Sequence, residues 1–200
     1  EQLLGELDIA LCRSWDEVAQ NLDTGNLAFM PLGDWMPALQ RMIDLRNVLG
    51  LRSPIHSLAR ILNPLAARCG LQSIFHPGYQ AVHREASQLL GDHAIVVKGD
   101  GGEIELNPDA VCHLYGTERG ENWDEDWPML SERRHVKPER LDPTHLQAVW
   151  RGEAEDAYGQ LAIIATMALA LRGLGLQREA AFAEAEKRWQ ARHLSSQPIR

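Results

Sequence analysis

The chain has 200 residues, 44% hydrophobic and 24% charged, which is enough for an ordinary globular protein to bury a sizeable core. Its longest apolar stretch, residues 161–171, is too short to span a bilayer. A formal charge of −8 argues against a polyanion partner only if the charge is evenly spread, because nucleic acid requires a locally basic surface.

The charge is not evenly spread. Residues 41–98 hold seven Lys and Arg against three acids, whereas residues 100–126 hold nine acids against Arg119. The acidic run is typical of a solvated surface, and the basic stretch fits either a ligand surface or a solvated one. Three widely spaced cysteines without a CxxC pair favour reduced thiols and a cytoplasmic protein.

Hydrophobic periodicity and turn residues predict the elements in chain order. They are a helix near 2–7, a strand at 27–30, helices at 36–48 and 54–62, a strand at 71–75, a helix at 80–90, strands at 94–97 and 103–106, and helices at 144–150, 156–171 and 178–189. The charged, proline-broken stretch 117–143 is expected to be an irregular excursion. Alternating strands and helices indicate an α/β fold with a mostly parallel central sheet flanked by helices. We expect one domain over residues 1–200, incomplete at its N-terminus.

Two arginines, Arg46 and Arg52, stand either side of Gly50, just before a helix. Ser53 is a good N-cap for that helix, and Asn63-Pro64 ends it. The glycines of residues 99–102 follow one predicted strand and lead into another, so they predict a hairpin turn rather than a phosphate cradle.

A family resemblance is carried by three stretches. They are the run Leu45-Arg46-Asn47-Val48-Leu49-Gly50-Leu51-Arg52-Ser53, which leads into Asn63-Pro64, together with Phe29-Met30-Pro31 and Pro37-Ala38. The chain resembles the large α/β domain of anthranilate phosphoribosyltransferases, members of glycosyltransferase family 3, and most of all a divergent, nucleic-acid-binding branch. The resemblance implies that a glycine-rich phosphate loop and a small helical domain lie upstream of this segment. It also implies a homodimer, and the apolar helix 157–171 fits either a subunit contact or pure core.

The resemblance places Arg46 where the family grips the carboxylate of anthranilate, with Arg52 and His56 as neighbouring ligand contacts. Met36 replaces an acceptor-contacting histidine. An adjacent Asp-Glu pair that implies magnesium binding is reduced to Glu103 followed by Ile104, a weak anchor for the ion. The sequence therefore assigns no catalytic residue.

Two functions remain open, besides a scaffold with neither activity. In the first, the chain holds nucleic acid non-specifically through Arg52, Arg60, Arg84 and Lys98. In the second, a transferase moves a phosphoribosyl group from phosphoribosyl pyrophosphate, with Mg²⁺, to a small acceptor with or without a carboxylate. The eroded metal pair favours the first, and Arg46 with its glycine turn favours the second.

Overall fold

The computed structural model describes residues 4, 9–99, 104–132, 134–136 and 142–192. The chain, expected to form one domain, divides into two compact units. Unit 1 comprises residues 1–59, 138–155 and 191–200, and unit 2 comprises residues 60–137 and 156–190. Two separate sets of contacts account for the division, because the short helices of unit 1 pack among themselves while the sheet organises unit 2. The predicted helix near 2–7 falls almost entirely outside the described residues.

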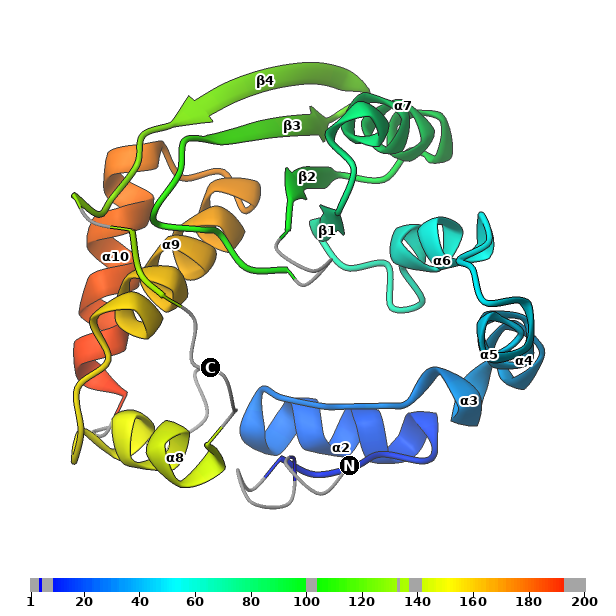
Figure 1. The fold of residues 1–200 in the computed structure, drawn as a ribbon, viewed down its shortest axis with the longest axis horizontal. Coiled ribbons are helices and arrows are strands. Elements are labelled where there is room, and N and C mark those ends of the chain that lie inside the picture. Colours follow the sequence, from blue (N-terminus) through cyan, green and yellow to red (C-terminus); the bar gives the residue numbers. More distant parts are fainter. Residues whose placement is uncertain (1–3, 5–8, 100–103, 133, 137–141, 193–200) are drawn as a thin grey trace. The chain divides into compact units, whose positions relative to one another are not determined.

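Unit 2 is built on a four-stranded sheet in the order β1-β2-β3-β4 (Figure 1). Its strands are β1 (Gly70–Ile74), β2 (Ala94–Lys98), β3 (Cys112–Glu118) and β4 (Glu121–Trp127). The remaining elements of the unit are η2 (Pro77–Tyr79), α7 (Gln80–Leu90), α9 (Ala157–Gly173) and α10 (Arg178–Ala191), the last residue of which is assigned to unit 1. The predicted α/β class, a sheet flanked by helices, is confirmed.

The sheet is mixed rather than mostly parallel among its described strands. β1 and β2 are parallel because α7 crosses over between them, with Gly70 paired to Ala94 and Ile74 to Lys98. β2–β3 and β3–β4 are antiparallel. The β3–β4 connection is a two-residue hairpin in which Arg119 and Gly120 both have positive φ, 52° and 81°, as a tight turn of this hand requires.

This hairpin corrects the expectation of an irregular excursion over 117–143 for residues 117–127, whereas the described residues 128–132 and 134–136 form no helix or strand, as expected. Residues 121–127 form β4, an edge strand whose exposed acids are equally typical of a solvated loop. The strand expected at 103–106 is not formed at residues 104–106, where the backbone N–H of Leu106 donates instead to the side-chain Oγ1 of Thr166 on α9, at 3.1 Å.

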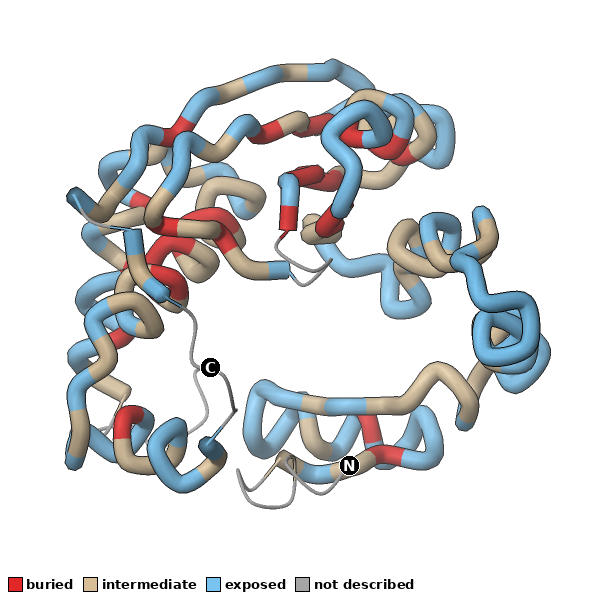
Figure 2. Tube along the Cα trace, in the orientation of Figure 1, coloured by how far each residue is buried: buried red, intermediate tan, exposed pale blue. Residues whose placement is uncertain are grey.

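α7 and α9 cover opposite faces of the sheet. Gln72 of β1 faces α7, where its Nε2 donates to Ser87 Oγ at 2.9 Å and its Oε1 lies 3.1 Å from His83 Nδ1. Ile95 of β2 lies in the alternate register and packs beside Gly173 at the end of α9. Residues 94–97 are accordingly at most 1% exposed, which confirms the strand predicted to be covered on both faces (Figure 2).

α9 is a core helix of unit 2. Its Ala165, Ala168 and Leu169 are at most 1% exposed, and the helix packs against β2. The apolar character of α9 is therefore explained within one chain, and it no longer argues for a subunit contact. The homodimer stays a prediction.

Unit 1 consists of short helices. They are α2 (Trp15–Gly25), α3 (Leu32–Trp35), α4 (Pro37–Asp44), α5 (Arg46–Leu49), α6 (Ile55–Leu58) and α8 (Pro143–Arg151), with the 3₁₀ turn η1 (Ala59–Ile61) leading into unit 2. The strand expected at 27–30 is reduced to one parallel bridge between Phe29 and Leu11. The predicted helix 36–48 is interrupted at Leu45, between α4 and α5.

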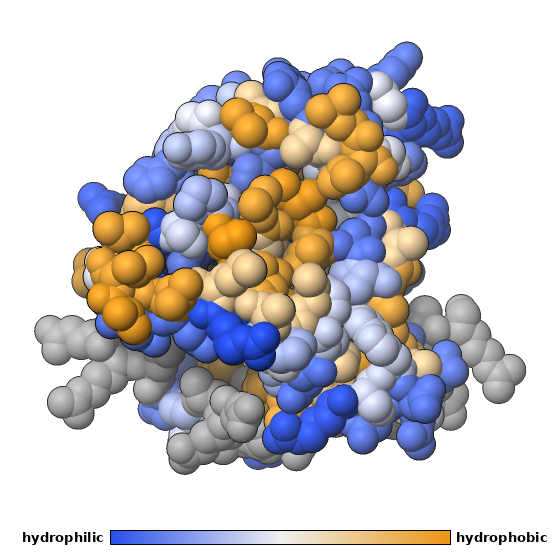
Figure 3. Space-filling view, turned by 90° about the vertical axis from the view of Figure 1, so that its right-hand side faces the viewer, coloured by the Kyte–Doolittle hydropathy of each residue, from blue (hydrophilic) through white to orange (hydrophobic). Residues whose placement is uncertain are grey.

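Unit 1 buries little and exposes much apolar surface among its described residues. Val48 is 81% exposed, and Met42, Leu45, Leu49 and Leu51 are 48–61% exposed. Apolar side chains accordingly show at the surface on the side viewed in Figure 3. Helices of four to eight residues have too few turns to bury a continuous apolar stripe against one another.

Candidate functional site

The carboxyl ends of β1 and β2 are where open α/β sheets usually bind ligands. The two strand ends are tied together by Gly99 N–H, which donates to the carbonyl of Ile74 at 3.2 Å. Phe75 and His76 follow β1 with their rings edge to face, 4.9 Å between centroids, and Lys98 ends β2 with an exposed side chain. The next residues, including the proposed metal ligand Glu103 and the predicted hairpin turn, lie outside the described residues.

The ligand residues taken from the family resemblance lie in unit 1. Arg46 is the first residue of α5 and Arg52 lies in the turn after it; both are exposed, and Gly50 closes α5 with φ of 71°. Neither guanidinium makes a hydrogen bond, ion pair or ring contact among the described residues. Exposed guanidinia of this kind are available to carboxylates or phosphates.

His56 has a structural task that the sequence did not suggest. Its Nδ1 lies 3.2 Å from the backbone N of Ser53 and accepts that N–H, so the imidazole closes the start of α6. The Ser53 side chain makes no capping bond to the helix, and Pro54 occupies the N-cap position. The other ring nitrogen, Nε2, is buried and has no partner in the described part of the chain.

Two of the arginines predicted to contact nucleic acid already bind other groups within unit 2. Arg60 donates from Nη1 to the carbonyl of Ser73 at 2.9 Å. Arg84 pairs with Asp124 and lies over the ring of Tyr115, 5.5 Å from its centroid, with its side chain only 15% exposed. Because α7 packs against the sheet, Arg84 points along β3 and β4 rather than to solvent.

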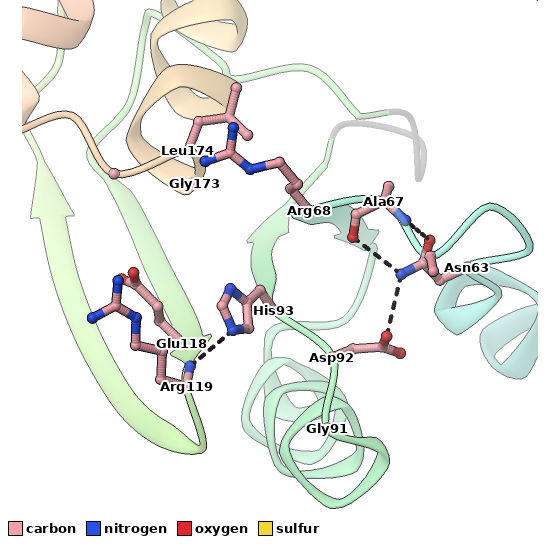
Figure 4. A pocket seen from close by; sticks show the side chains of 12 residues that line it. Asn63, Ala67, Arg68, Gly91, Asp92, His93, Glu118, Arg119, Gly173 and Leu174 are labelled. Atoms are coloured by element: carbon pink, nitrogen blue, oxygen red, sulfur yellow. Dashed lines mark hydrogen bonds between the residues drawn. The ribbon is translucent and has the colours of Figure 1, made fainter.

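A pocket of about 420 Å³ lies at the opposite edge of the sheet, before the amino ends of β1 and β2 (Figure 4). Four segments of unit 2 line it: the loop before β1, the turn after α7, the β3–β4 hairpin and the end of α9. Its polar lining residues are Asn63, Arg68, Asp92, His93, Glu118 and Arg119. A smaller hollow of about 190 Å³ adjoins it and shares Asn63, Asp92 and His93.

Hydrogen bonds fix the walls of this pocket. Asn63 Oδ1 accepts the N–H of Ala67 at 2.8 Å, and Asn63 Nδ2 donates to Asp92 Oδ1 at 3.2 Å. His93 Nε2 accepts the backbone N–H of Arg119 at 3.0 Å. A neutral His93 must therefore carry its proton on Nδ1, which leaves a donor beside the pocket.

No sequence signal pointed to this pocket. Along the chain, Arg68 and Arg119 stand out only as members of a basic stretch and an acidic run, and the residues that line the pocket are spread over more than 110 positions. Sequence periodicity finds residues that share one element, whereas this pocket joins four segments through the sheet.

The described residues contain no group of three or more His, Cys, Asp or Glu able to hold a metal ion. Within the same residues, no helix is long and apolar enough to cross a membrane.

No family model matches the chain. Its relatives include anthranilate phosphoribosyltransferases from Polynucleobacter necessarius, 33% identical over 106 residues, and from Paracidovorax citrulli, 31% identical over 156 residues. These matches cover 52% and 74% of this chain but 31% and 45% of the two relatives. The chain thus spans less than half the length of either relative.

Among solved structures, anthranilate phosphoribosyltransferase from Saccharomyces cerevisiae in complex with 4-fluoroanthranilate matches with a TM-score of 0.75 and 15% identity. The match covers 96% of this chain and 58% of the yeast chain, and at this identity it shows the fold alone. By partial sequence similarity and by fold, the chain is anthranilate-phosphoribosyltransferase-like at the level of the family.

Proposed function

We propose that this chain binds the sugar-phosphate backbone of nucleic acid, without strong sequence preference, through the exposed arginines of unit 1. The observation behind the proposal is that Arg41, Arg46 and Arg52 are all exposed within 12 consecutive residues. The one acid between residues 37 and 57 is Asp44, which accepts a hydrogen bond from Gln40 Nε2 at 2.8 Å. Local guanidinium contacts are needed, because the net charge of −8 repels a polyanion at long range.

The proposed contact set differs from the one expected from sequence. Arg52 is exposed and stays in the set, whereas Lys98, also exposed, lies in unit 2 and is left out of this unit 1 surface; its contact with nucleic acid stays a separate prediction. Arg60 and Arg84 are left out, because each already holds another part of unit 2. Moving Arg84 to a phosphate would break its pair with Asp124 and its stacking on Tyr115.

Fluorescence anisotropy with short unrelated oligonucleotides, between about 50 and 200 mM salt, tests this proposal. Removing one phosphate-binding arginine should lower the salt slope by about 0.7 for single strands or about 0.9 for duplex DNA. The variant Arg46→Gln/Arg52→Gln should therefore weaken binding to all sequences alike and lower the slope by about 1.4 for single strands or about 1.8 for duplex DNA.

Arg151→Gln is a control for loss of an exposed arginine, because Arg151 is exposed at the end of α8, outside the arginine segment; the single variants Arg46→Gln and Arg52→Gln match it in charge. It should leave both the affinity and the salt slope unchanged. Equal binding by wild type and the double variant, or no binding at 50 mM salt, would eliminate nucleic acid as the ligand of this surface.

The second candidate is phosphoribosyl transfer to a small carboxylate-bearing acceptor, with phosphoribosyl pyrophosphate as donor and Mg²⁺ as its counterion. Relatives named anthranilate phosphoribosyltransferase favour it, and the exposed Arg46 suits a bidentate carboxylate grip. Against it stand Met36 and Glu103, which has no carboxylate neighbour in the sequence.

Arg46→Lys separates the two candidates. A lysine keeps the positive charge that a phosphate backbone requires but lacks the planar two-donor fork that matches a carboxylate. Binding of nucleic acid should then change by less than about twofold, whereas binding of anthranilate, measured by calorimetry, should weaken by about tenfold. Anthranilate binding by wild type that falls about tenfold in Arg46→Lys would support the transferase, whereas nucleic-acid binding that persists in Arg46→Lys, with no anthranilate binding by wild type, would support the first candidate.

A further inference from the structure

The pocket at the amino ends of β1 and β2 presents three donor groups to one space. The guanidinium of Arg68, the ring of His93 and the Glu118–Arg119 corner of the hairpin face one another across it (Figure 4). Neither guanidinium has a hydrogen-bond or ion-pair partner among the described residues. Two free guanidinia and an imidazole N–H are donors only, so a ligand that binds all three must offer several acceptor lone pairs.

The charges around this space favour an anion. The four charged lining residues, Arg68, Arg119, Asp92 and Glu118, sum to zero, but only Glu118 has its carboxylate on the same side of the His93 ring as the two guanidinia. Asp92 lies on the other side of the His93 ring, where Asn63 Nδ2 donates to it (Figure 4). A carboxylate ligand would neutralise one guanidinium, whereas a phosphate monoester carries about −1.5 to −2 charges and three acceptor oxygens for both.

Glu118 and the size of the pocket indicate what the phosphate is attached to. At about 420 Å³ the pocket holds far more than one phosphate and falls in the usual range for small-molecule sites. An ionised Glu118 only accepts hydrogen bonds, so it suits a hydroxyl donor.

We propose that this pocket binds a small phosphorylated sugar, with its phosphate between Arg68, His93 Nδ1–H and Arg119 and a sugar hydroxyl on Glu118. The site lies at the sheet edge opposite the carboxyl ends of β1 and β2, wholly within unit 2. It is thus separate from the arginine segment of unit 1, and it does not depend on the function proposed above.

Calorimetric titration with ribose 5-phosphate, inorganic phosphate and ribose tests the site. Wild type should bind ribose 5-phosphate at least about tenfold more tightly than inorganic phosphate and should not bind ribose measurably at the same concentrations. Arg68→Gln and Arg119→Gln should each raise the Kd for ribose 5-phosphate by roughly tenfold, the worth of one charge-assisted contact.

Glu118→Gln should reduce the preference for ribose 5-phosphate over inorganic phosphate, because only the sugar reaches Glu118, whereas loss of its negative charge favours both anions alike. Arg151→Gln, in unit 1, is the control and should bind like wild type. Circular dichroism melting verifies folding; Arg68 is exposed, so Arg68→Gln should melt like wild type. Equal Kd values for wild type and both arginine variants, or equal binding of ribose 5-phosphate and inorganic phosphate, would overturn the proposal.

Discussion

Gly116 of β3 lies directly beneath the indole of Trp123 on β4, its cross-strand partner. A Cβ at this position would lie 2.5 Å from Cδ2 of the indole and closer still to Cε2 and Cζ2. The indole in turn carries the guanidinium of Arg172 from α9, 4.3 Å from the ring centroid. The absence of a side chain at Gly116 therefore lets the indole of Trp123 lie over β3 while it contacts Arg172 of α9.

Gly116→Ala forces the indole to move. Overpacking of this kind costs about 1 to 3 kcal/mol, and disrupting the cation–π interaction costs about 0.5 to 2 kcal/mol more. We expect the free energy of unfolding to fall by roughly 2 to 4 kcal/mol. Urea unfolding followed by circular dichroism at 222 nm measures it without interference from tryptophan fluorescence.

Trp123→Ala provides the refuting experiment. In that background the clash is gone, and alanine should be better than glycine in a strand by about 0.5 to 1 kcal/mol, so the effect of Gly116→Ala should change sign. Gly25→Ala is the control, since a Cβ there meets nothing within 4 Å. An equal loss of stability from Gly116→Ala in both backgrounds would refute the stacking argument.

Two further predictions concern protonation. Burial, and then the charge of Arg60, lower the pKa of His83 below 6.5, so the stability present above pH 6.5 should be lost as the pH falls from 6.5 to that lower value. Chemical denaturation from pH 7.5 to 5 should show the loss, and an unaltered dependence of unfolding free energy on pH in His83→Gln would contradict it. Burial, aided by the charge of Glu118, raises the pKa of the Cys69 thiol from 9.0 to about 11. Alkylation of the folded protein by iodoacetamide at pH 8 should therefore be about 100-fold slower than alkylation of the urea-unfolded protein, as followed by mass spectrometry; equal rates would count against the prediction.

The sequence alone determined the elements whose signals are local. α7 runs from Gln80 to Leu90, as predicted, because Gly91 ends it in a left-handed conformation with φ of 75°. The apolar run 94–97 became a buried strand because four consecutive apolar residues need cover on both faces. The α/β class followed from the alternation of such elements.

The sequence could not determine how strands pair or which charges meet. The acidic segment Glu121–Trp127 is compatible in sequence with an edge strand as well as with a solvated loop. Only its pairing with β3 decides between the two. Arg84 and Arg46 look alike in sequence, yet one is held by Asp124, 40 positions away, and the other is exposed.

The pocket is likewise a product of tertiary structure. His93 acquires a defined tautomer from the N–H of Arg119, 26 residues later, and Arg68 meets the end of α9 more than 100 residues along the chain. Hydrophobic periodicity and turn residues report interactions within a few residues, so they fix helices and strands. Long-range contacts depend on how those elements pack, and only the folded sheet brings Arg68, His93 and Arg119 together.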